Sequence, residues 1–302
     1  MSPPSEALNL AAPAQWPVVQ GAPRLTQARC GLLREITILD EYGERRTIPI
    51  PVERPLTVFV DKRELVTLMT LGDKPELLVL GYLRNQRLIE RVEQIESISV
   101  DWEVGAAAVR TREGLSDLEA RTARRVVTTG CGQGTVYGDM MSQIDSVKLP
   151  DASVARIRQS TLRRMLETIR QQDSIHRQAG SVHGCALFRG AEMLMFVEDV
   201  GRHNAIDTIS GWMAMHGVQG ADKAFFTTGR LTSEMVMKAA QIGVPIIVSR
   251  NGVTAMGFDL AAKLGITLFG RAANRHFLCY SGFERFDSEP EPQRAPVRVV
   301  AG

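Results

Sequence analysis

Cys131 is the side chain whose setting best suits chemistry. It lies in the segment TTGCGQGTVYGD, where four glycines surround it. Helices and strands tolerate so many glycines poorly, so this segment is predicted to be a loop. A cysteine there has little apolar wall to bury it, and Arg121, Arg124 and Arg125 would lower the pKa of its thiol if they fold close by. Cys131 is therefore a candidate nucleophile, against the alternative that it is an inert, buried thiol.

Four further segments place a glycine and an arginine, usually with a hydroxyl or amide, at the end of a predicted strand. Glycine lets a backbone approach a ligand closely, and a helix N-terminus presents free N–H groups to an anion. Arginine adds paired hydrogen bonds to phosphate. The sequence therefore favours a phosphorylated or nucleotide-like ligand at this edge of a sheet. The candidate residues are Gly229, Arg230, Ser233, Arg250, Thr254 and Gly270, with Glu198, Asp199, Arg202, His203 and Asn204 shaping the pocket.

Each of these residues also has a simpler structural interpretation. Ser233 and Thr254 would serve as ordinary helix caps, and the arginines would be solvated. Acidic residues beside arginine, such as Glu198 and Asp199, more often fix a loop through ion pairs than act as acid–base catalysts. His203 would more often be a hydrogen-bonded loop residue. The ligand hypothesis rests on four such segments meeting at one edge.

Several classes of site are excluded by missing motifs. A zinc deaminase needs H-x-E followed by P-C-x-x-C. The segment His183-Gly184-Cys185 lacks the glutamate, and no P-C-x-x-C occurs, so no zinc is expected. The G-x-S-x-G and Walker A motifs are also absent.

The segments that must position these residues follow two patterns. From about residue 26 to 88 short apolar runs alternate with turn signals, which predicts strands, with a helix over 75–89. A helix is predicted to start behind Asp151 as its cap, and strands then alternate with helices, which indicates βαβ units and a substantially parallel sheet. We therefore predict an α/β protein (α+β overall) with a β-rich N-terminal domain and a C-terminal α/β domain. The expected boundaries are a disordered leader over 1–25, a β-rich domain over 26–125, a Gly-rich loop with Cys131 over 126–150, the cofactor-binding domain over 151–285 and a tail over 286–302.

The amino-acid composition excludes several classes of binding partner. Lys plus Arg (36) nearly balance Asp plus Glu (34), without the basic excess that a nucleic-acid binder carries. No apolar run reaches the roughly 18 residues of a membrane span. The four cysteines are too scattered for a disulfide framework, which indicates a reducing cytoplasm, and Cys30, Cys185 and Cys279 are predicted to lie in strands or apolar stretches of the core.

Three segments resemble the formate dehydrogenase accessory sulfurtransferase family, FdhD. They are EDVGRHNAID (198–207), GRLTSEMVMKAAQIGVPIIVSR (229–250) and LAAKLGITLFG (260–270). The resemblance implies that Cys131 receives sulfur as a persulfide from a cysteine desulfurase. It implies delivery of that sulfur to the molybdenum or tungsten bis-guanine-dinucleotide cofactor, for formate dehydrogenase or a related molybdoenzyme. It also implies a homodimer, and a C-terminal αβα domain resembling the cytidine deaminase fold without its zinc.

Two departures from the family pattern leave alternatives open. The sulfur loop, usually C-G-x-C, here ends in Gly134. A persulfide needs only one thiolate, so transfer through Cys131 stays possible; the alternative is a cofactor-binding chaperone or paralogue without sulfur transfer. Residues 251–254 replace the usual A-P-T, which leaves the client enzyme open. A stand-alone nucleotide-processing enzyme is a third hypothesis, but no nucleophile–base pair is visible.

Overall fold

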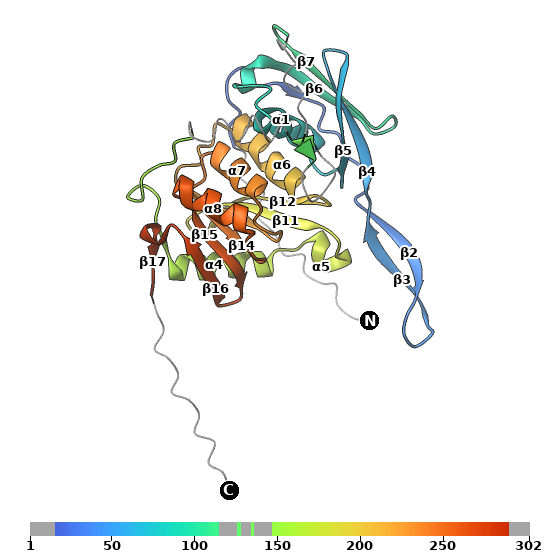
Figure 1. Ribbon diagram of the computed structural model, residues 1–302. Helices are drawn as coiled ribbons and strands as arrows, with labels where there is room; N and C mark the ends of the chain where they lie inside the picture. The colour runs from blue at the N-terminus through green and yellow to red at the C-terminus, as the bar shows by residue number, and fades with distance from the viewer. Residues whose placement is uncertain (1–15, 115–125, 128–133, 136–146, 290–302) are drawn as a thin grey trace.

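The computed structural model describes residues 16–114, 126–127, 134–135 and 147–289. Most of its helices lie between two large sheets, and helices also cover the far side of the second sheet (Figure 1). This arrangement agrees with the mixed α/β class that the sequence predicts. In the described part of the chain, no helix combines the length and apolar character needed to cross a membrane.

The N-terminal half is built on a five-stranded sheet in the order β1-β6-β7-β4-β5. Alternate residues of each strand point inward, so Leu56 and Val58 are fully buried in the core under helix α1. The elements of this half are β1 (Arg24–Leu25), β4 (Arg54–Val60), β5 (Arg63–Thr70), α1 (Pro75–Asn85), η1 (Val92–Gln94), β6 (Ile95–Asp101) and β7 (Ala106–Thr111). Every strand expected here from apolar alternation is confirmed, and so is the helix.

A two-stranded ribbon projects from this half as an arm (Figure 1). It consists of β2 (Leu33–Leu39) and β3 (Arg45–Pro51), paired antiparallel. None of its residues is fully buried, and Leu39 and Tyr42 near its tip are exposed.

The C-terminal half is built on a six-stranded sheet in the order β12-β11-β13-β14-β15-β16. Parallel pairing joins β13 to β14 and β14 to β15, whereas the other pairings are antiparallel. The prediction of a substantially parallel sheet is confirmed for β13, β14 and β15, while hairpins over residues 183–199 and 267–281 make the flanks antiparallel. The strands are β11 (His183–Arg189), β12 (Glu192–Asp199), β13 (Lys223–Thr227), β14 (Ile246–Ser249), β15 (Thr267–Ala273) and β16 (His276–Ser281).

Helices cover both faces of this sheet. One face, which includes Leu187 and Phe225, packs against three helices: α6 (Arg202–Met215), α7 (Ser233–Gln241) and α8 (Ala255–Leu264). The other, which includes Phe188 and Phe226, packs against α4 (Gln159–Gln171). The remaining short elements are β8 (Val126–Val127), β9 (Gly134–Thr135), β10 (Ile157–Arg158), α5 (Ile175–Ala179), η3 (Phe283–Arg285) and β17 (Phe286–Asp287). The three layers agree with the expected αβα order, and the likeness to cytidine deaminase stays a prediction.

The two halves meet where α1 crosses α6. A Cβ at Gly81 would overlap the backbone oxygen of Asp207, and a Cβ at Gly211 would overlap that of Leu77. Glycine at both positions therefore lets the two helix backbones touch, which brings the N-terminal sheet against the start of α6.

Three expected boundaries are corrected. The helix expected behind Asp151 begins only at Gln159, because residues 157–158 pair with β17 and hold the chain extended. Residues 16–25 of the expected leader are ordered, and the Trp16 ring packs edge-on against that of Trp212, with ring centroids 5.4 Å apart. The expected tail starts too early, since Phe286 packs against Phe269 at 5.1 Å.

Candidate functional site

The predicted strand-end segments do meet at one edge of the six-stranded sheet. Strands β12, β13, β14 and β15 run in the same direction, so their carboxyl ends lie together. After β13, the Thr228 N–H donates to the Gly184 carbonyl at 2.9 Å, and the Thr228 hydroxyl accepts from the Gly184 N–H at 3.0 Å. After β14, the Arg250 N–H donates to the Thr227 carbonyl at 3.1 Å. These bonds fix both segments on the sheet beyond the last paired residues.

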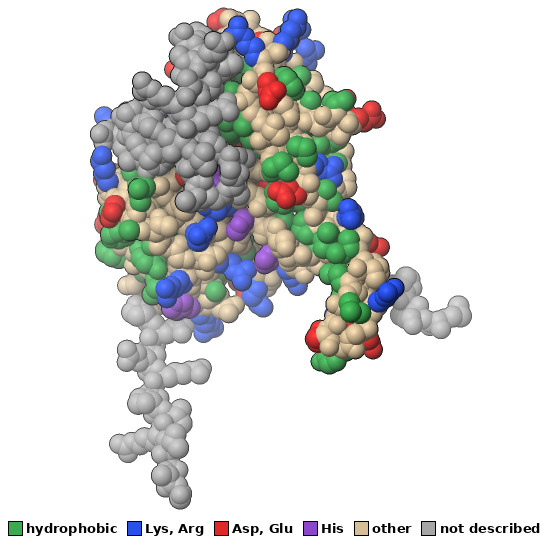
Figure 2. Space-filling model, turned by 45° about the vertical axis from the view of Figure 1, so that its right-hand side comes forward, with side chains coloured by type: hydrophobic (Ala, Val, Ile, Leu, Met, Phe, Trp, Pro, Cys, Tyr) green, Lys and Arg blue, Asp and Glu red, His purple; other side chains and the backbone are tan. Residues whose placement is uncertain are grey.

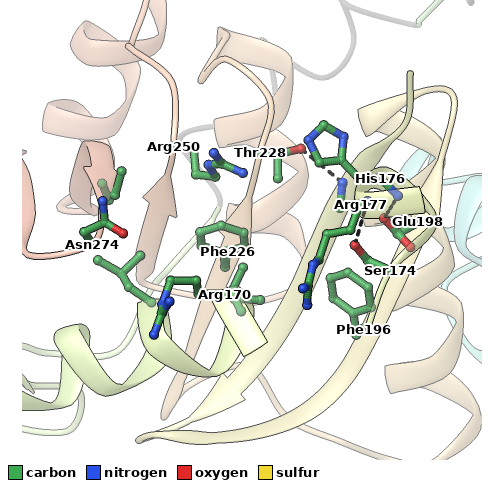
Figure 3. Close-up of a pocket in the computed structure, with 15 residues that line it drawn as sticks. Arg170, Ser174, His176, Arg177, Phe196, Glu198, Phe226, Thr228, Arg250 and Asn274 are labelled. Carbon is green, nitrogen blue, oxygen red and sulfur yellow. Dashed lines mark hydrogen bonds between the residues drawn. The ribbon is translucent and has the colours of Figure 1, made fainter. Parts of the chain in front are cut away.

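A cavity of about 290 Å³ opens beside these segments, between the sheet and helices α4 and α5. Phe196 and Phe226 contribute aromatic side chains, while Thr228, Ser174 and Asn274 contribute polar ones (Figure 3). An aromatic surface suits stacking of a flat heterocycle, and the polar groups suit its ring substituents. The lining residues are Leu166, Ile169, Arg170, Ser174, His176, Arg177, Gly184, Phe196, Glu198, Phe226, Thr228, Arg250 and Ala272 to Asn274.

The cavity is rich in positive charge. Arg170, Arg177 and Arg250 line it, and basic side chains lie side by side with histidines on one face of the molecule (Figure 2). Glu198 is the acid among the described lining residues, but its carboxylate is already engaged. It accepts from the Ile175 N–H at 2.6 Å and the His176 N–H at 3.0 Å, at the start of α5. An anionic group entering the cavity therefore meets the guanidinium groups of Arg177 and Arg250, whereas Arg170 already pairs with Glu167.

His183 lies next to the cavity, with its side chain half-buried. Burial lowers the pKa of His183, and the charges of Arg202, His176 and Arg230 lower it further. Its Nδ1 lies 3.4 Å from the Thr228 hydroxyl. The lowered pKa favours the neutral form of His183, and the predicted residues Arg202 and Arg230 act on it from outside the cavity lining.

Asp199 and Asn204, predicted to shape a pocket, lie buried at the junction of the two halves. The Asp199 carboxylate accepts from the Thr70 hydroxyl at 2.5 Å and from the backbone N–H groups of Leu71 and Gly201. Asn204 donates to the same carboxylate at 2.8 Å and to the Met69 carbonyl at 2.7 Å. Burial raises the pKa of Asp199 to about 6, and the surrounding donors oppose that rise. Both residues therefore tie α6 to the end of β5 through hydrogen bonds.

His203 is likewise an internal residue. Its side chain is 3% exposed, and its Nε2 lies 3.2 Å from a carboxylate oxygen of Glu234. Burial lowers the pKa of His203 to about 2, and the charges of Lys238 and Arg202 act in the same direction. The imidazole is therefore neutral, and neither His203 nor Glu234 lines the cavity.

The glycines at the strand ends have protein neighbours in the space where a ligand was expected. A Cβ at Gly229 would lie 2.5 Å from Cδ of Arg202, which passes over it. A Cβ at Gly270, inside β15, would lie 2.7 Å from the Tyr280 ring. Packing thus explains both glycines without a ligand, contrary to the expectation that they make room for one.

The two hydroxyl residues lie at helix starts. The Thr254 side chain accepts from the Gly257 N–H at 3.2 Å and so caps α8, the simpler interpretation offered by the sequence. Ser233 is the first residue of α7, half-buried and outside the cavity lining. Of the predicted ligand residues, Glu198 and Arg250 are the ones that line the cavity.

Cys131 lies outside the described residues. The short strands β8 and β9 pair on either side of its segment, Val126 with Thr135 and Val127 with Gly134. Cys185 is fully buried, and burial raises the pKa of its thiol to about 12, so the prediction of a core cysteine is confirmed for it. Cys30 is half-buried in an irregular segment, which corrects its expected place in a strand or apolar core, and Cys279 is half-buried in β16.

Several lining residues were missed by sequence reasoning. Phe196 and Phe226 follow strand alternation, which placed them on one face of the sheet but could not say which helix covers it. His176 and Arg177 sit in a five-residue helix, α5, too short to give a periodic signal. Among the described residues, no group of three or more His, Cys, Asp or Glu side chains is placed to hold a metal ion.

Known proteins are similar to this chain in sequence and in fold. The model of the FdhD/NarQ family matches residues 51–287. The chain is 31% identical to the sulfur carrier protein FdhD of Listeria monocytogenes over 237 residues, covering 78% of this chain and 90% of the relative. It is 29% identical to that of Bacillus pumilus, with 82% and 95% covered. A crystal structure from Desulfotalea psychrophila, provisionally described as a formate dehydrogenase accessory protein, superposes with a TM-score of 0.69 at 25% identity, covering 84% of this chain and 98% of that one.

Proposed function

The chain belongs to the FdhD/NarQ family, and from this premise we propose that it carries sulfur on Cys131 for the maturation of a molybdenum-dependent formate dehydrogenase. The sulfur would come from a cysteine desulfurase. Its destination would be the molybdenum or tungsten bis-guanine-dinucleotide cofactor, bound here as cargo before it enters the client enzyme. We place this exchange in the cytoplasm, on a homodimer.

The observation that carries the proposal is the basic, aromatic-lined cavity at the strand ends. Phe196 and Phe226 suit stacking of a guanine ring, and Arg250, Arg177 and Arg170 suit its phosphates. A volume of about 290 Å³ accepts one nucleotide end of so large a cargo. The rest of the cargo would therefore extend over the open edge of the sheet.

The sulfur chemistry constrains what Cys131 can do. Its thiolate attacks the outer sulfur of the desulfurase persulfide; one S–S bond breaks, another forms, and the desulfurase thiolate leaves, with no net oxidation. Release of that sulfur as sulfide requires a thiol to attack the Cys131 sulfur and form a disulfide. Because Gly134 replaces the second cysteine of the loop, that thiol must come from outside the loop. The lost cysteine is also what favours the second candidate function, a cofactor-binding chaperone without sulfur transfer.

Mass spectrometry of the intact protein separates these two functions. After incubation with a cysteine desulfurase and cysteine, wild type and Cys30→Ala are expected to gain a reducible sulfur, and Cys131→Ala is not. Cys30 is the control because it is a half-buried cysteine with a raised pKa. If the wild type gains no sulfur from a desulfurase that does load a known acceptor, sulfur transfer is contradicted and the chaperone function is favoured.

The cavity is tested by nucleotide binding. Arg250→Gln is expected to weaken binding of GDP about tenfold, because it removes a charge-assisted bond to phosphate. The matched control is Arg189→Gln, an exposed arginine that pairs with Glu192 away from the cavity. Isothermal titration calorimetry measures the GDP affinity of the wild type and of both variants. Equal affinities for all three proteins would show that GDP does not bind in this cavity.

A further inference from the structure

A second cavity, of about 490 Å³, lies where residues 25–32 pass over the start of α1 and the end of α6. Apolar residues make up much of its lining, namely Leu25, Ala28, Leu32, Leu77 and Met215. Its volume falls within the range of small-molecule sites, roughly 300 to 1,000 Å³. None of its described lining residues belongs to the nucleotide pocket proposed above. The proposed function therefore leaves this cavity without a role.

One wall of this cavity is fixed by Glu76, the second residue of α1. Its Oε1 accepts from the Thr26 hydroxyl at 2.6 Å and from the Ala28 N–H at 2.7 Å. The Thr26 hydroxyl accepts from the Val100 N–H at 3.0 Å, which ties the same segment to β6. These bonds join three segments that are distant in the sequence, so the cavity is formed before any ligand enters.

The Glu76 carboxylate keeps one oxygen for a ligand. The residue is only 3% exposed, and its hydrogen bonds with the described residues all go to Oε1. Oε2 is not among the fully buried atoms that lack a partner, and Glu76 lines the cavity, so Oε2 opens onto it. A carboxylate oxygen only accepts hydrogen bonds, and a charged N–H group is its strongest donor. Oε2 therefore selects a ligand with a cationic donor.

The other charged residues of the lining do not compete with this carboxylate. Lys74 is bound to Asp73, so these two charges neutralise each other. Arg29 is exposed, and water and salt screen its charge from a ligand inside the cavity. His216 contributes an imidazole whose Nδ1 already lies 3.0 Å from a backbone carbonyl. The buried negative charge of Glu76 therefore decides the sign of the ligand, which is positive.

We propose that this cavity binds a small apolar molecule that carries a protonated amine. The ammonium group donates to Oε2 of Glu76, and the hydrocarbon body lies against Leu25, Leu77 and Met215. Covering the carboxylate without supplying a counter-charge is costly, so a neutral molecule of the same shape binds less tightly. This site depends neither on the proposed sulfur transfer nor on its nucleotide cargo.

The probes are phenethylamine and its neutral analogue phenethyl alcohol, titrated into the protein and followed by NMR at about pH 8, where the amine is protonated. Wild type is expected to bind the amine about tenfold or more tighter than the alcohol. In Glu76→Gln this preference should fall to about twofold or less, because glutamine keeps a carbonyl oxygen for Thr26 and Ala28 but turns an N–H donor towards the ligand. The matched control is Glu192→Gln, which replaces an exposed glutamate that pairs with Arg189 and does not line the cavity.

Thiol labelling of the wild type shows whether the amine lies in this cavity. Cys30 belongs to the lining, so saturating phenethylamine is expected to slow its modification by methyl methanethiosulfonate about threefold or more, as read from the peptide mass, whereas GDP is not. This measurement decides the location even where Glu76→Gln fails to fold. The proposal is overturned by equal affinities for amine and alcohol, by a preference that survives in Glu76→Gln or is lost in Glu192→Gln, or by an unprotected Cys30.

Discussion

Gly81→Ala is expected to cost more than about 3 kcal/mol of unfolding free energy and to leave little folded protein at 37 °C. The added Cβ would overlap the carbonyl of Asp207 and would also lie 2.7 Å from the Gly211 nitrogen. These are backbone atoms of α6, so no side chain can rotate away, and the two helices must separate. Separation also breaks the polar contacts that α6 makes with the N-terminal half.

The measurement is urea denaturation followed by circular dichroism, with Gly31→Ala as the matched control. A Cβ added at Gly31 would have no neighbour within 4 Å, and Gly31 has no positive φ, so its replacement is expected to change stability by less than about 0.5 kcal/mol. Gly211→Ala should behave like Gly81→Ala, because its Cβ would overlap the carbonyl of Leu77. A similar midpoint for Gly81→Ala and Gly31→Ala would show that the helices can part at little cost.

The contacts at this helix crossing could not be predicted from the sequence. Strand alternation and helical periodicity located most of the large elements, since each pattern is local. The role of segment 198–207 depended instead on distant partners. Asp199, Asn204 and Asp207 bond to groups of the N-terminal half that lie 122 to 135 residues away in the sequence. Their residue types therefore suggested a ligand pocket, whereas in the structure they are buried where the two halves of the protein meet.

The sequence also predicted only part of the cavity lining. Arg250 could be predicted because it follows a strand whose end lies at a known edge. Arg170 and Arg177 could not, because nothing local tells which face of the sheet α4 and α5 cover. The helix that carries Arg170 was recognised, but its start was placed at Asp151, eight residues before Gln159. Pairing of residues 157–158 with β17 decides that start, and such pairing leaves no local pattern.

Lys238→Met is expected to destabilise the protein by about 3–5 kcal/mol at pH 8, because it leaves a buried carboxylate without its counter-charge. Lys238 Nζ donates to both oxygens of Asp207, at 2.9 and 2.8 Å, and the two side chains are 1% and 0% exposed. Asn85 donates to the same carboxylate at 2.7 Å but brings no charge. Methionine fills a similar volume, so the loss of charge outweighs any loss of packing.

Lys223→Met is the matched control for this buried lysine. Lys223 is also nearly buried and pairs with Asp222, but the Asp222 side chain is 51% exposed and stays hydrated when its partner is removed. The control is therefore expected to cost less than about 1 kcal/mol. Equal costs for the two lysine variants would show that the Asp207 charge needs no partner.

The pH dependence of Lys238→Met identifies Asp207 as the cause. Burial already raises the pKa of Asp207 above its ordinary value of 3.8, and the charge of Lys238 opposes that rise. Without Lys238 the folded protein holds a proton on Asp207 at pH values where the unfolded chain has lost it, so stability falls as the pH rises. The deficit against wild type should be smaller at pH 5 than at pH 8. Lys238→Met/Asp207→Asn should remove this pH dependence and recover part of the loss, whereas additive costs would place the effect elsewhere, because Asp207 and Lys238 would then act independently.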